Sequence, residues 1–494
     1  MSVFVTEEPK LSNQYLDDQW LQNYLSEKIP AELRPEIVRD LTQFGERVIG
    51  DIYEMGKKAE KEEPKLVEQD GIFNIEISTA WYALHGVSAE EGLIAIGQEK
   101  RFGEYARIYQ FAKKYLFNSS SAYFSCPLAM TDGALKVLLQ QMEKSLSQNE
   151  TELYGQAIEH LLAKNPNKFW TSGQWMTEKS GGSDVSNTET VARFENGRWH
   201  LHGIKWFTSA VDSQMSLALA KPEGSDQLQL FLVKVRDDFG SLNNIKIIGL
   251  KNKLGTKALP TAELELCGTP AIPIGKPGEG VKLISTQFNV TRIHNALECV
   301  SSMRRQLALL KDYAGKRTAF GKRLCDLPLF QATFNQLEST FKDCFRLTFF
   351  AVELLGKSEQ GSTEEIQQLA EKKLRMLTPL LKLYTAKENI KLSSEVIESF
   401  GGVGYLEDSG IPKFLRDAQV LSIWEGTTNV LSLDFLRALK KEGPEVLGEL
   451  VDPDFLKKFN ERISAMDPLT LERCAREISL EVVGQVLTRI AKTK

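Results

Sequence analysis

Apolar residues recur every three or four positions from about residue 13 to 165, which is the spacing of helices with one buried face. Ile37, Leu41 and Phe44, for example, would share one face of a single helix. The helical period returns after the middle of the chain, where an apolar stripe predicts a long helix over 293–310. The pattern therefore predicts helices at both ends of the chain, with a helical bundle in the second half.

The intervening segment has a different pattern, in which apolar and polar positions alternate over short runs. Residues 198–210, 227–235 and 261–272 are such runs, separated by Gly, Pro, Asn and Asp. This alternation is typical of antiparallel strands in a small barrel or sandwich. The predicted fold class is α+β, mainly α. Its predicted domains are an N-terminal helical domain (1–165), an antiparallel β domain (166–275), a C-terminal helical bundle (276–440) and a short helical tail (441–494).

Charge and cysteine content narrow the class of protein. The 61 basic and 66 acidic residues leave a net charge of −5, so no overall positive field attracts nucleic acid, although a local basic patch stays open. The six cysteines are scattered and predict reduced thiols. The segment before Arg34 lacks arginine and an apolar signal region, and no apolar run reaches the length of a membrane span. We therefore expect a cytoplasmic protein without a membrane anchor.

Two polar features each have competing interpretations. His200 and His202 would share a strand face, as zinc ligands can, but no third ligand is apparent and ordinary surface histidines explain them better. No metal site is therefore predicted. The loop with Gly181, Gly182 and Ser183 would expose backbone N–H groups that hold phosphate oxygens, or it would form a plain hydrophilic turn.

Two further segments raise the question of a bound heterocycle and a buried acid. Trp206 and Thr208 would share one strand face, which suits a flat ring, although alternating core packing explains the pair equally well. Glu425 lies between Trp424 and Gly426, with apolar stretches on both sides. Such an acid is either a satisfied structural group or a base that is kept away from water.

Four motifs together resemble the acyl-CoA dehydrogenase family of flavoproteins. The first signature of that family is similar to MTEKSGGSD (176–184), and the second is similar to FGGVGYLEDSGIPKFLRD (400–417). KRTAFGKRL (316–324) resembles an Arg-x-x-Phe-Gly element, and IWEGTTN (423–429) resembles a Tyr-Glu-Gly-Thr segment. The motifs keep the family's order over about residues 80–437. The resemblance implies an N-terminal helical domain, a middle antiparallel β-barrel and a C-terminal four-helix bundle.

The phrases LSNQYLDD and MTEKSGGSDVSNTET, and the tryptophan before Glu425, resemble the AidB-like, alkylation-response branch. The resemblance implies FAD, an acyl-CoA substrate, an electron-transfer flavoprotein as electron acceptor, and a homotetramer built as a dimer of dimers. The implied cofactor-binding residues are Met176, Thr177, Gly182, Ser183, Trp206, Thr208, Arg317, Phe320, Gly401, Gly402, Thr427 and Asn429. The implied substrate-binding residues are Ser183, Arg292, Trp424 and Gly426.

Some of these residues carry a specific role by resemblance. Trp206 would pack beside the flavin ring, and Arg317 and Phe320 would hold the cofactor of a neighbouring subunit. The turn at Gly401, Gly402 and Gly404 would let backbone approach the adenosine half of FAD. The resemblance therefore distributes the cofactor site over the β domain and two segments of the helical bundle.

Glu425 is the implied catalytic base, which removes the proton α to a thioester while the β-hydrogen leaves as hydride to the flavin. A dry site strengthens a carboxylate as a base. Some family members carry the base at the position matched here by Thr291, which cannot serve as one. Arg292 matches a family arginine near the site, or it is the ion-pair partner of a bundle carboxylate.

A second hypothesis keeps the flavin fold but replaces turnover with binding. Such a protein would sense an acyl-CoA or lipid, or would bind DNA as an alkylation-response protein. The charges over residues 438–494 alternate in sign, which favours solvated helix faces over a DNA-binding surface. Trp424 bears on the same choice, because its ring would either narrow the acyl channel or simply pack.

Overall fold

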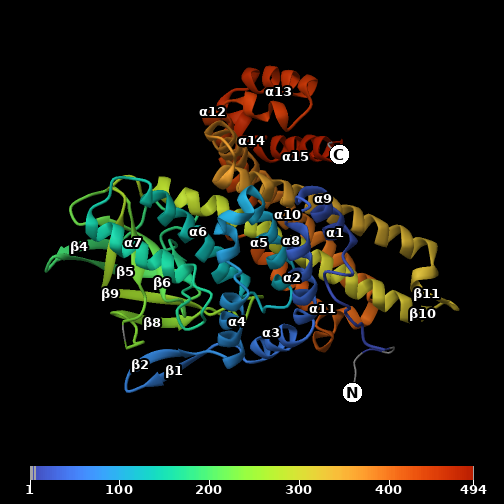
Figure 1. Ribbon diagram of the computed structural model, residues 1–494, viewed down its shortest axis with the longest axis horizontal. Coiled ribbons are helices and arrows are strands. Elements are labelled where there is room, and N and C mark those ends of the chain that lie inside the picture. Colours follow the sequence, from blue (N-terminus) through green and yellow to red (C-terminus); the bar gives the residue numbers. More distant parts are fainter. Residues whose placement is uncertain (1–3, 5–6, 238, 493–494) are drawn as a thin grey trace. The chain divides into compact units, whose positions relative to one another are not determined.

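The computed structural model describes residues 4, 7–237 and 239–492 (Figure 1). The chain folds into two compact units that interleave along the sequence. The first unit comprises residues 1–51, 97–119 and 292–494, and the second comprises residues 52–96 and 120–291. The predicted linear domains 1–165, 166–275, 276–440 and 441–494 divide the chain differently and stay predictions.

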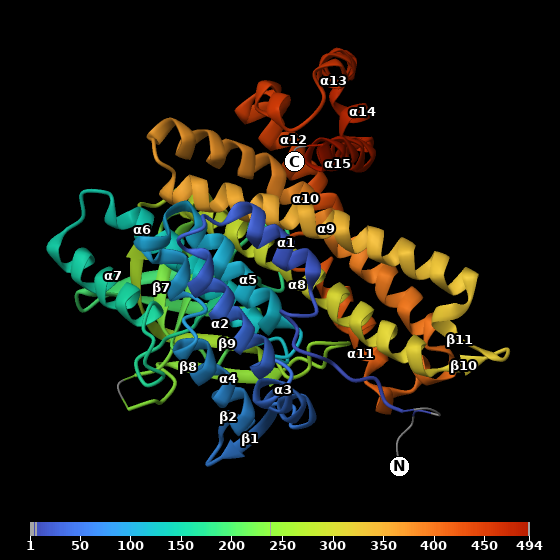
Figure 2. The same cartoon turned by 45° about the vertical axis from the view of Figure 1, so that its right-hand side comes forward.

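The first unit is helical, which confirms the prediction of a mainly α protein with a helical bundle. Helix α8 begins in the second unit and enters the first at Arg292, and helices α9 and α10 pack side by side in both views (Figures 1 and 2). The α-helices of this unit are α1 (Gln19–Lys28), α2 (Arg34–Arg47), α5 (Ala106–Asn118), α8 (Gly280–Lys316), α9 (Pro328–Gln360), α10 (Glu364–Ser399), α11 (Ile411–Leu421), α12 (Thr428–Glu442), α13 (Pro453–Ala465), α14 (Pro468–Arg473) and α15 (Ala475–Lys492). A two-stranded hairpin, β10 (Thr318–Ala319) and β11 (Lys322–Arg323), follows α8.

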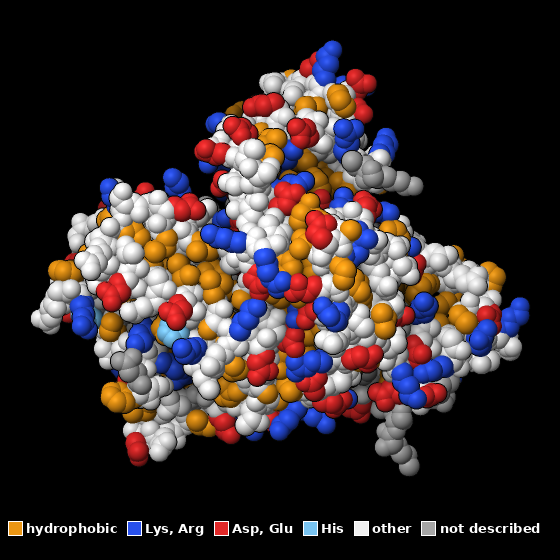
Figure 3. Space-filling view, in the orientation of Figure 1, with side chains coloured by type: hydrophobic (Ala, Val, Ile, Leu, Met, Phe, Trp, Pro, Cys, Tyr) orange, Lys and Arg blue, Asp and Glu red, His pale blue; other side chains and the backbone are white. Residues whose placement is uncertain are grey.

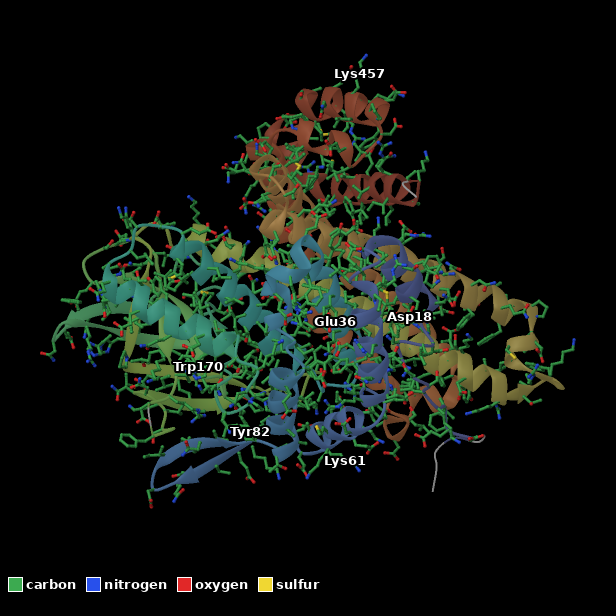
Figure 4. All side chains as sticks on the ribbon, in the orientation of Figure 1. Asp18, Glu36, Lys61, Tyr82, Trp170 and Lys457 are labelled. Carbon is green, nitrogen blue, oxygen red and sulfur yellow. The ribbon has the colours of Figure 1, made fainter. Side chains whose placement is uncertain are left out.

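Asp18, labelled in Figure 4, shows how polar groups fix three of these helices. Its carboxylate accepts a hydrogen bond from the backbone N–H of Leu21 at 3.0 Å and so caps α1. The other carboxylate oxygen accepts from the Tyr115 hydroxyl on α5 at 2.6 Å and from Arg304 Nε on α8 at 3.1 Å. A single buried carboxylate therefore joins α1, α5 and α8.

The second unit contains the predicted β-barrel. Strands β6, β4, β5, β9 and β7 form a closed ring because β7 also pairs with β6, while β3 adds to β6 and β8 adds to β9. The pairings β3–β6 and β4–β6 are parallel, and the other pairings of the sheet are antiparallel. The barrel strands are β3 (Ser172–Trp175), β4 (Val191–Glu195), β5 (Arg198–Ser209), β6 (Met215–Pro222), β7 (Gln229–Lys234), β8 (Ile245–Leu250) and β9 (Thr261–Ile274). The unit also holds α3 (Asp51–Lys61), the hairpin β1 (Lys65–Gln69) and β2 (Ile72–Glu76), α4 (Thr79–Glu90), α6 (Ser125–Met142) and α7 (Gln148–Leu161).

Strand β5 carries an irregularity that changes one sequence prediction. Its register with β9 shifts between Lys205 and Thr208, so two residues oppose one on the partner strand. Trp206 and Phe207 are consequently both exposed, whereas Lys205 and Thr208 are fully buried. The prediction that Trp206 and Thr208 share one strand face is therefore wrong, because the bulge breaks the alternation on which it relied.

The surface shown in Figure 3 carries side chains of both charges. On the face shown in Figure 3, acidic and basic side chains are intermixed over α13 to α15. Among the described residues, no helix is long and apolar enough to cross a membrane. In the same part of the chain, no group of three or more His, Cys, Asp or Glu side chains is placed to hold a metal ion.

Candidate functional site

Glu425 lies in the loop between α11 and α12, with its backbone in the left-handed region at φ 57°. This conformation disfavours a side chain by about 1–2 kcal/mol, so neighbouring contacts must hold it. The next residue, Gly426, has φ 106°, which favours glycine. The loop thus turns sharply at the acid, and the glycine that follows is required by the backbone.

Two buried cations hold this turn through its backbone carbonyls. Arg292 Nε on α8 donates to the Glu425 carbonyl oxygen at 3.2 Å, and Lys382 Nζ on α10 donates to the Gly426 carbonyl oxygen at 2.6 Å. Arg292 is 7% exposed and Lys382 is 1% exposed. Since both donors are fixed on long helices, they restrain the backbone that carries the carboxylate without using the carboxylate itself.

Asp434 on α12 anchors one of these cations. Its carboxylate accepts hydrogen bonds from Arg292 at 2.7 Å and from Arg375 on α10 at 2.6 Å and 3.0 Å. Burial raises the pKa of Asp434, but the hydrogen bond from Arg375 and the charges of both arginines outweigh burial and lower the pKa to about 2. Arg292 is therefore both the ion-pair partner of a bundle carboxylate and a contact of the Glu425 loop.

We expect Asp434→Asn to destabilise the first unit by on the order of 3 kcal/mol, because two arginines lose their shared carboxylate. In the wild type, the folded-state pKa lies below the ordinary 3.8, so this stabilisation is complete above about pH 4 and is lost as the pH falls through about 2. Thermal unfolding of both proteins at acidic and neutral pH measures the effect. Equal acid sensitivity of variant and wild type would contradict the assignment.

Sequence reasoning missed Lys382, Arg375 and Asp434. Lys382 interrupts the apolar run LTPLLKLY, and a lone lysine on the buried side of a helix was a usable signal. Burial lowers the pKa of Lys382 to about 7, against the opposing effect of the negative charge of Glu425. Arg375 and Asp434 carried no such signal, because they are separated by 59 positions in the sequence.

In the second unit, Glu178 holds the segment that follows β3. Its carboxylate accepts hydrogen bonds of 2.6 Å from Lys205 Nζ, from the Thr190 hydroxyl and from the Glu189 backbone N–H. Burial raises the pKa of Glu178, but the charge and hydrogen bond of Lys205 outweigh burial and lower it. The Lys205 ammonium also donates to the Leu219 carbonyl oxygen at 2.8 Å. A fully buried ion pair thus fastens the 176–184 segment to β5.

Comparison with known proteins identifies the family. Family models match as the acyl-CoA dehydrogenase C-terminal domain over residues 278–440, its middle domain over 173–268, and the adaptive response protein AidB N-terminal domain over 6–157. Acyl-CoA dehydrogenase family member 11 of Caenorhabditis elegans is 43% identical over 489 residues, which cover 92% of this chain and 77% of that protein. The chain belongs to the acyl-CoA dehydrogenase family. The AidB-type N-terminal domain confirms the predicted branch.

Two solved structures of similar proteins share the fold along the whole chain. Bd2924 in its apo form is 45% identical, with a TM-score of 0.92 over 99% of each chain. Caenorhabditis elegans ACDH-11 in complex with C11-CoA is 39% identical, with a TM-score of 0.89 over 99% of this chain and 89% of that one. The acyl-CoA dehydrogenase fold predicted from sequence is therefore confirmed.

The residues of the second unit that the family resemblance assigns to flavin binding differ in their contacts and in their burial. The Thr177 carbonyl oxygen accepts a hydrogen bond from the Trp206 backbone N–H at 2.9 Å, so these two candidates lie together. A Cβ at Gly182 would come within 2.9 Å of Thr177 Cγ2, which places the glycine loop against the same residue. Met176 is buried and Ser183 is exposed.

Trp206 and Thr208 differ in their availability to a ligand. Trp206 is 36% exposed, and Lys251 Nζ lies 4.4 Å from its ring centroid. The Thr208 hydroxyl is buried and donates to the Ala262 carbonyl oxygen at 2.6 Å. An accepting group such as a flavin nitrogen would compete with Ala262 for this hydroxyl proton, so Thr208 is the weaker of the two assignments.

The family's remaining candidates lie in the first unit. Phe320 and Gly321 form the two-residue turn of the β10–β11 hairpin with φ 53° and 75°, and this geometry leaves Phe320 95% exposed at the tip. The hairpin lies far from α13 to α15 in both cartoon views (Figures 1 and 2). Arg317 precedes the hairpin. The other members are Gly401 and Gly402, which are exposed, Thr427 and Trp424, which are half-buried, and Asn429, which is exposed. Thr291, at the position of the alternative base, belongs to the second unit and is buried.

Proposed function

We propose that this chain is an FAD-dependent acyl-CoA dehydrogenase that introduces a double bond between the α and β carbons of an acyl-CoA thioester. The observation that carries the proposal is the turn at Glu425, whose backbone is fixed by Arg292 and Lys382 while its carboxylate takes no part in those two contacts. A base for the α-proton must be positioned to within a hydrogen-bond length, and a fixed backbone provides that positioning.

The chemistry divides between the carboxylate and its loop. Glu425 would take the α-proton, and backbone N–H groups of the same restrained loop would donate to the developing negative charge on the thioester oxygen. Some family members carry the base on a different helix, at the position matched here by Thr291. The Thr291 hydroxyl donates to the Phe288 carbonyl oxygen at 3.3 Å. Glu425 is therefore the base in this proposal.

The residues present fit FAD. Bound FAD would accept the β-hydrogen as hydride. The exposed Trp206 ring would pack beside the flavin, with Met176, Thr177, Gly182 and Ser183 around it. Thr208, which is buried and off the exposed face of Trp206, is the weaker candidate. At Gly401 and Gly402, an added Cβ would meet no protein atom within 4 Å, so this turn is open to a ligand's close approach. Thr427 and Asn429 complete the assignment.

Substrate and partners follow from the relatives. Because a protein 39% identical to this chain was solved with C11-CoA, we propose acyl chains of that length class. Arg292, Trp424, Gly426 and Ser183 are the proposed substrate contacts. Phe320, exposed at a hairpin tip, supports a homotetramer in which Arg317 and Phe320 hold the cofactor of a neighbouring subunit. An electron-transfer flavoprotein is the proposed electron acceptor, and a cytoplasmic location remains a proposal.

Anaerobic titration tests this function. The purified protein is checked for the yellow absorbance of FAD and is then mixed, without oxygen, with saturated acyl-CoAs that bracket eleven carbons. We expect the flavin to bleach with the best-fitting chain. A yellow protein that binds these acyl-CoAs and that none of them bleaches would overturn the dehydrogenase and favour the sensor alternative.

The glycine turn offers a separate test of FAD binding. We expect Gly402→Ala to leave thermal stability unchanged, since its Cβ meets open space, but to weaken FAD binding by at least about tenfold through a clash with the cofactor. Gly404→Ala is the matched control, because its Cβ would lie 2.2 Å from the Ile397 carbonyl oxygen and should lower stability by about 1–3 kcal/mol. FAD content and melting temperature are measured for both. Full FAD affinity in Gly402→Ala would remove this turn from the cofactor site.

A further inference from the structure

We infer that Lys382 is a positioning residue for Glu425, which clamps the acid's loop through Gly426 and changes the strength of the base as its own charge is gained or lost. The inference deepens the proposed function and rests on it for the role of Glu425 as base. It assigns a function to a buried lysine that sequence reasoning did not single out.

The geometry of the clamp is the first support. The Lys382 ammonium is buried on α10 and donates to the Gly426 carbonyl oxygen at 2.6 Å. That carbonyl directly follows the residue held at φ 57°, so the contact stabilises a strained turn. Arg292 acts on the preceding carbonyl from α8, and Asp434 neutralises Arg292. The positive charge of Arg292 is thus compensated by the Asp434 carboxylate, whereas Lys382 donates its hydrogen bond to an uncharged carbonyl oxygen.

The charges around Lys382 come from several elements. Glu425 on the loop favours the ammonium, and Arg292 on α8 and Lys387 on α10 oppose it. Cys299 on α8 also favours the ammonium. Burial is the largest influence and brings the pKa of Lys382 to about 7, so its charge changes near neutrality. Glu425 is the carboxylate among these partners.

The consequence for the base follows from reciprocity. If the charge of Glu425 favours the Lys382 ammonium, the ammonium equally favours the ionised form of Glu425. Below about pH 7 the charged lysine therefore helps Glu425 to lose its proton. Above that pH the neutral lysine leaves a carboxylate with greater proton affinity, which is a stronger base. The pair would thus keep the acid ionised at low pH and strengthen it at high pH.

A direct test needs no turnover. Lysine labelled with ¹³C at Cε is introduced into the whole protein, and the Lys382 signal is assigned by its loss in Lys382→Arg. We expect this signal to titrate near pH 7, and Glu425→Gln to lower its midpoint by about one pH unit or more, since an opposite charge has been removed. Glu388→Gln is the matched control on the same helix, where Glu388 pairs with Lys391, and should leave the midpoint in place. A Lys382 midpoint that Glu425→Gln does not move would overturn the inference.

Exchange of the acyl α-proton into deuterated water gives the functional arm. The exchange rate is measured as a function of pH. In Lys382→Met, we expect the acidic limb of this pH profile to move up by about one pH unit. In Lys382→Arg, we expect the acidic limb to stay in place and the inflection near pH 7 to vanish. Thermal unfolding checks that both variants fold. A wild type that exchanges no α-proton at any pH overturns the proposed function, and with it the role given to Lys382. Normal exchange with one unchanged profile in all three proteins overturns only the inference.

Discussion

Replacing Glu425 with glutamine is expected to slow flavin reduction by acyl-CoA by about 10²–10⁴-fold, the range that a positioned general base contributes. Glutamine has nearly the same shape, and the contact between Arg292 and this residue uses the backbone carbonyl. The loop, the FAD content and acyl-CoA binding should therefore be retained. Rapid mixing with acyl-CoA in the absence of oxygen measures the rate of bleaching.

Glu442→Gln provides the matched control for this variant. Glu442 ends α12, the helix that follows the Glu425 loop, and its carboxylate pairs with Lys441 at 3.5 Å. Removal of this charge should leave the bleaching rate at its wild-type value. A Glu425→Gln protein that is reduced as fast as the wild type would contradict the assignment of the base, even though FAD binding and the fold would remain as proposed.

The same experiment separates the two function classes that sequence left open. A dehydrogenase and a sensor would both bind acyl-CoA, so binding alone does not distinguish them. Only the dehydrogenase passes electrons to the flavin, and only in the dehydrogenase does Glu425→Gln remove a reaction that the wild type performs. Trp424 is half-buried next to the acid, and its ring would either narrow the acyl channel or simply pack. The dependence of bleaching on acyl chain length distinguishes these two roles.

Much of the fold was predictable because hydrophobic period is a local property of the sequence. The helical stripe at 293–310 became part of α8, and the alternating runs became strands of the barrel. The parallel pairing of β3 with β6 was not predictable, since alternation does not reveal the partner of a strand. The bulge in β5 was missed because a single extra residue reverses which side chains face inward.

The candidate site was predictable only where a motif marked it. Glu425 was proposed because it lies in a recognisable segment between apolar runs. Its supports lie far from it in the sequence. Arg292 precedes Glu425 by 133 positions, and Lys382 precedes Gly426, whose carbonyl oxygen it contacts, by 44 positions. Such pairings arise when long helices pack, and neither composition nor spacing determines which buried lysine meets which carbonyl. The positive φ at Glu425 likewise becomes visible only in the folded loop.

The buried pair of Glu178 and Lys205 should be the most sensitive stability determinant of the second unit. Both side chains are at most 4% exposed, and the pair lies between the 176–184 segment and β5. Removing one partner leaves the other charge buried without compensation, which costs about 3–5 kcal/mol. Glu178→Gln and Lys205→Met are each expected to lower the melting temperature of this unit by about 10 °C.

The double variant Glu178→Gln/Lys205→Met tests whether the single variants lose stability because a charge is left unpaired or because the side-chain shape has changed. It removes both charges, so it should recover a large part of the stability that either single variant loses, because no unpaired charge then remains in the interior. Glu223→Gln, which breaks the exposed pair with Arg193 on the same barrel, should change the melting temperature very little. Circular dichroism follows the unfolding of each variant. If the double variant is no more stable than the single ones, the hydrogen bonds of Glu178 with Thr190 and Glu189, and not its pairing with Lys205, hold the segment.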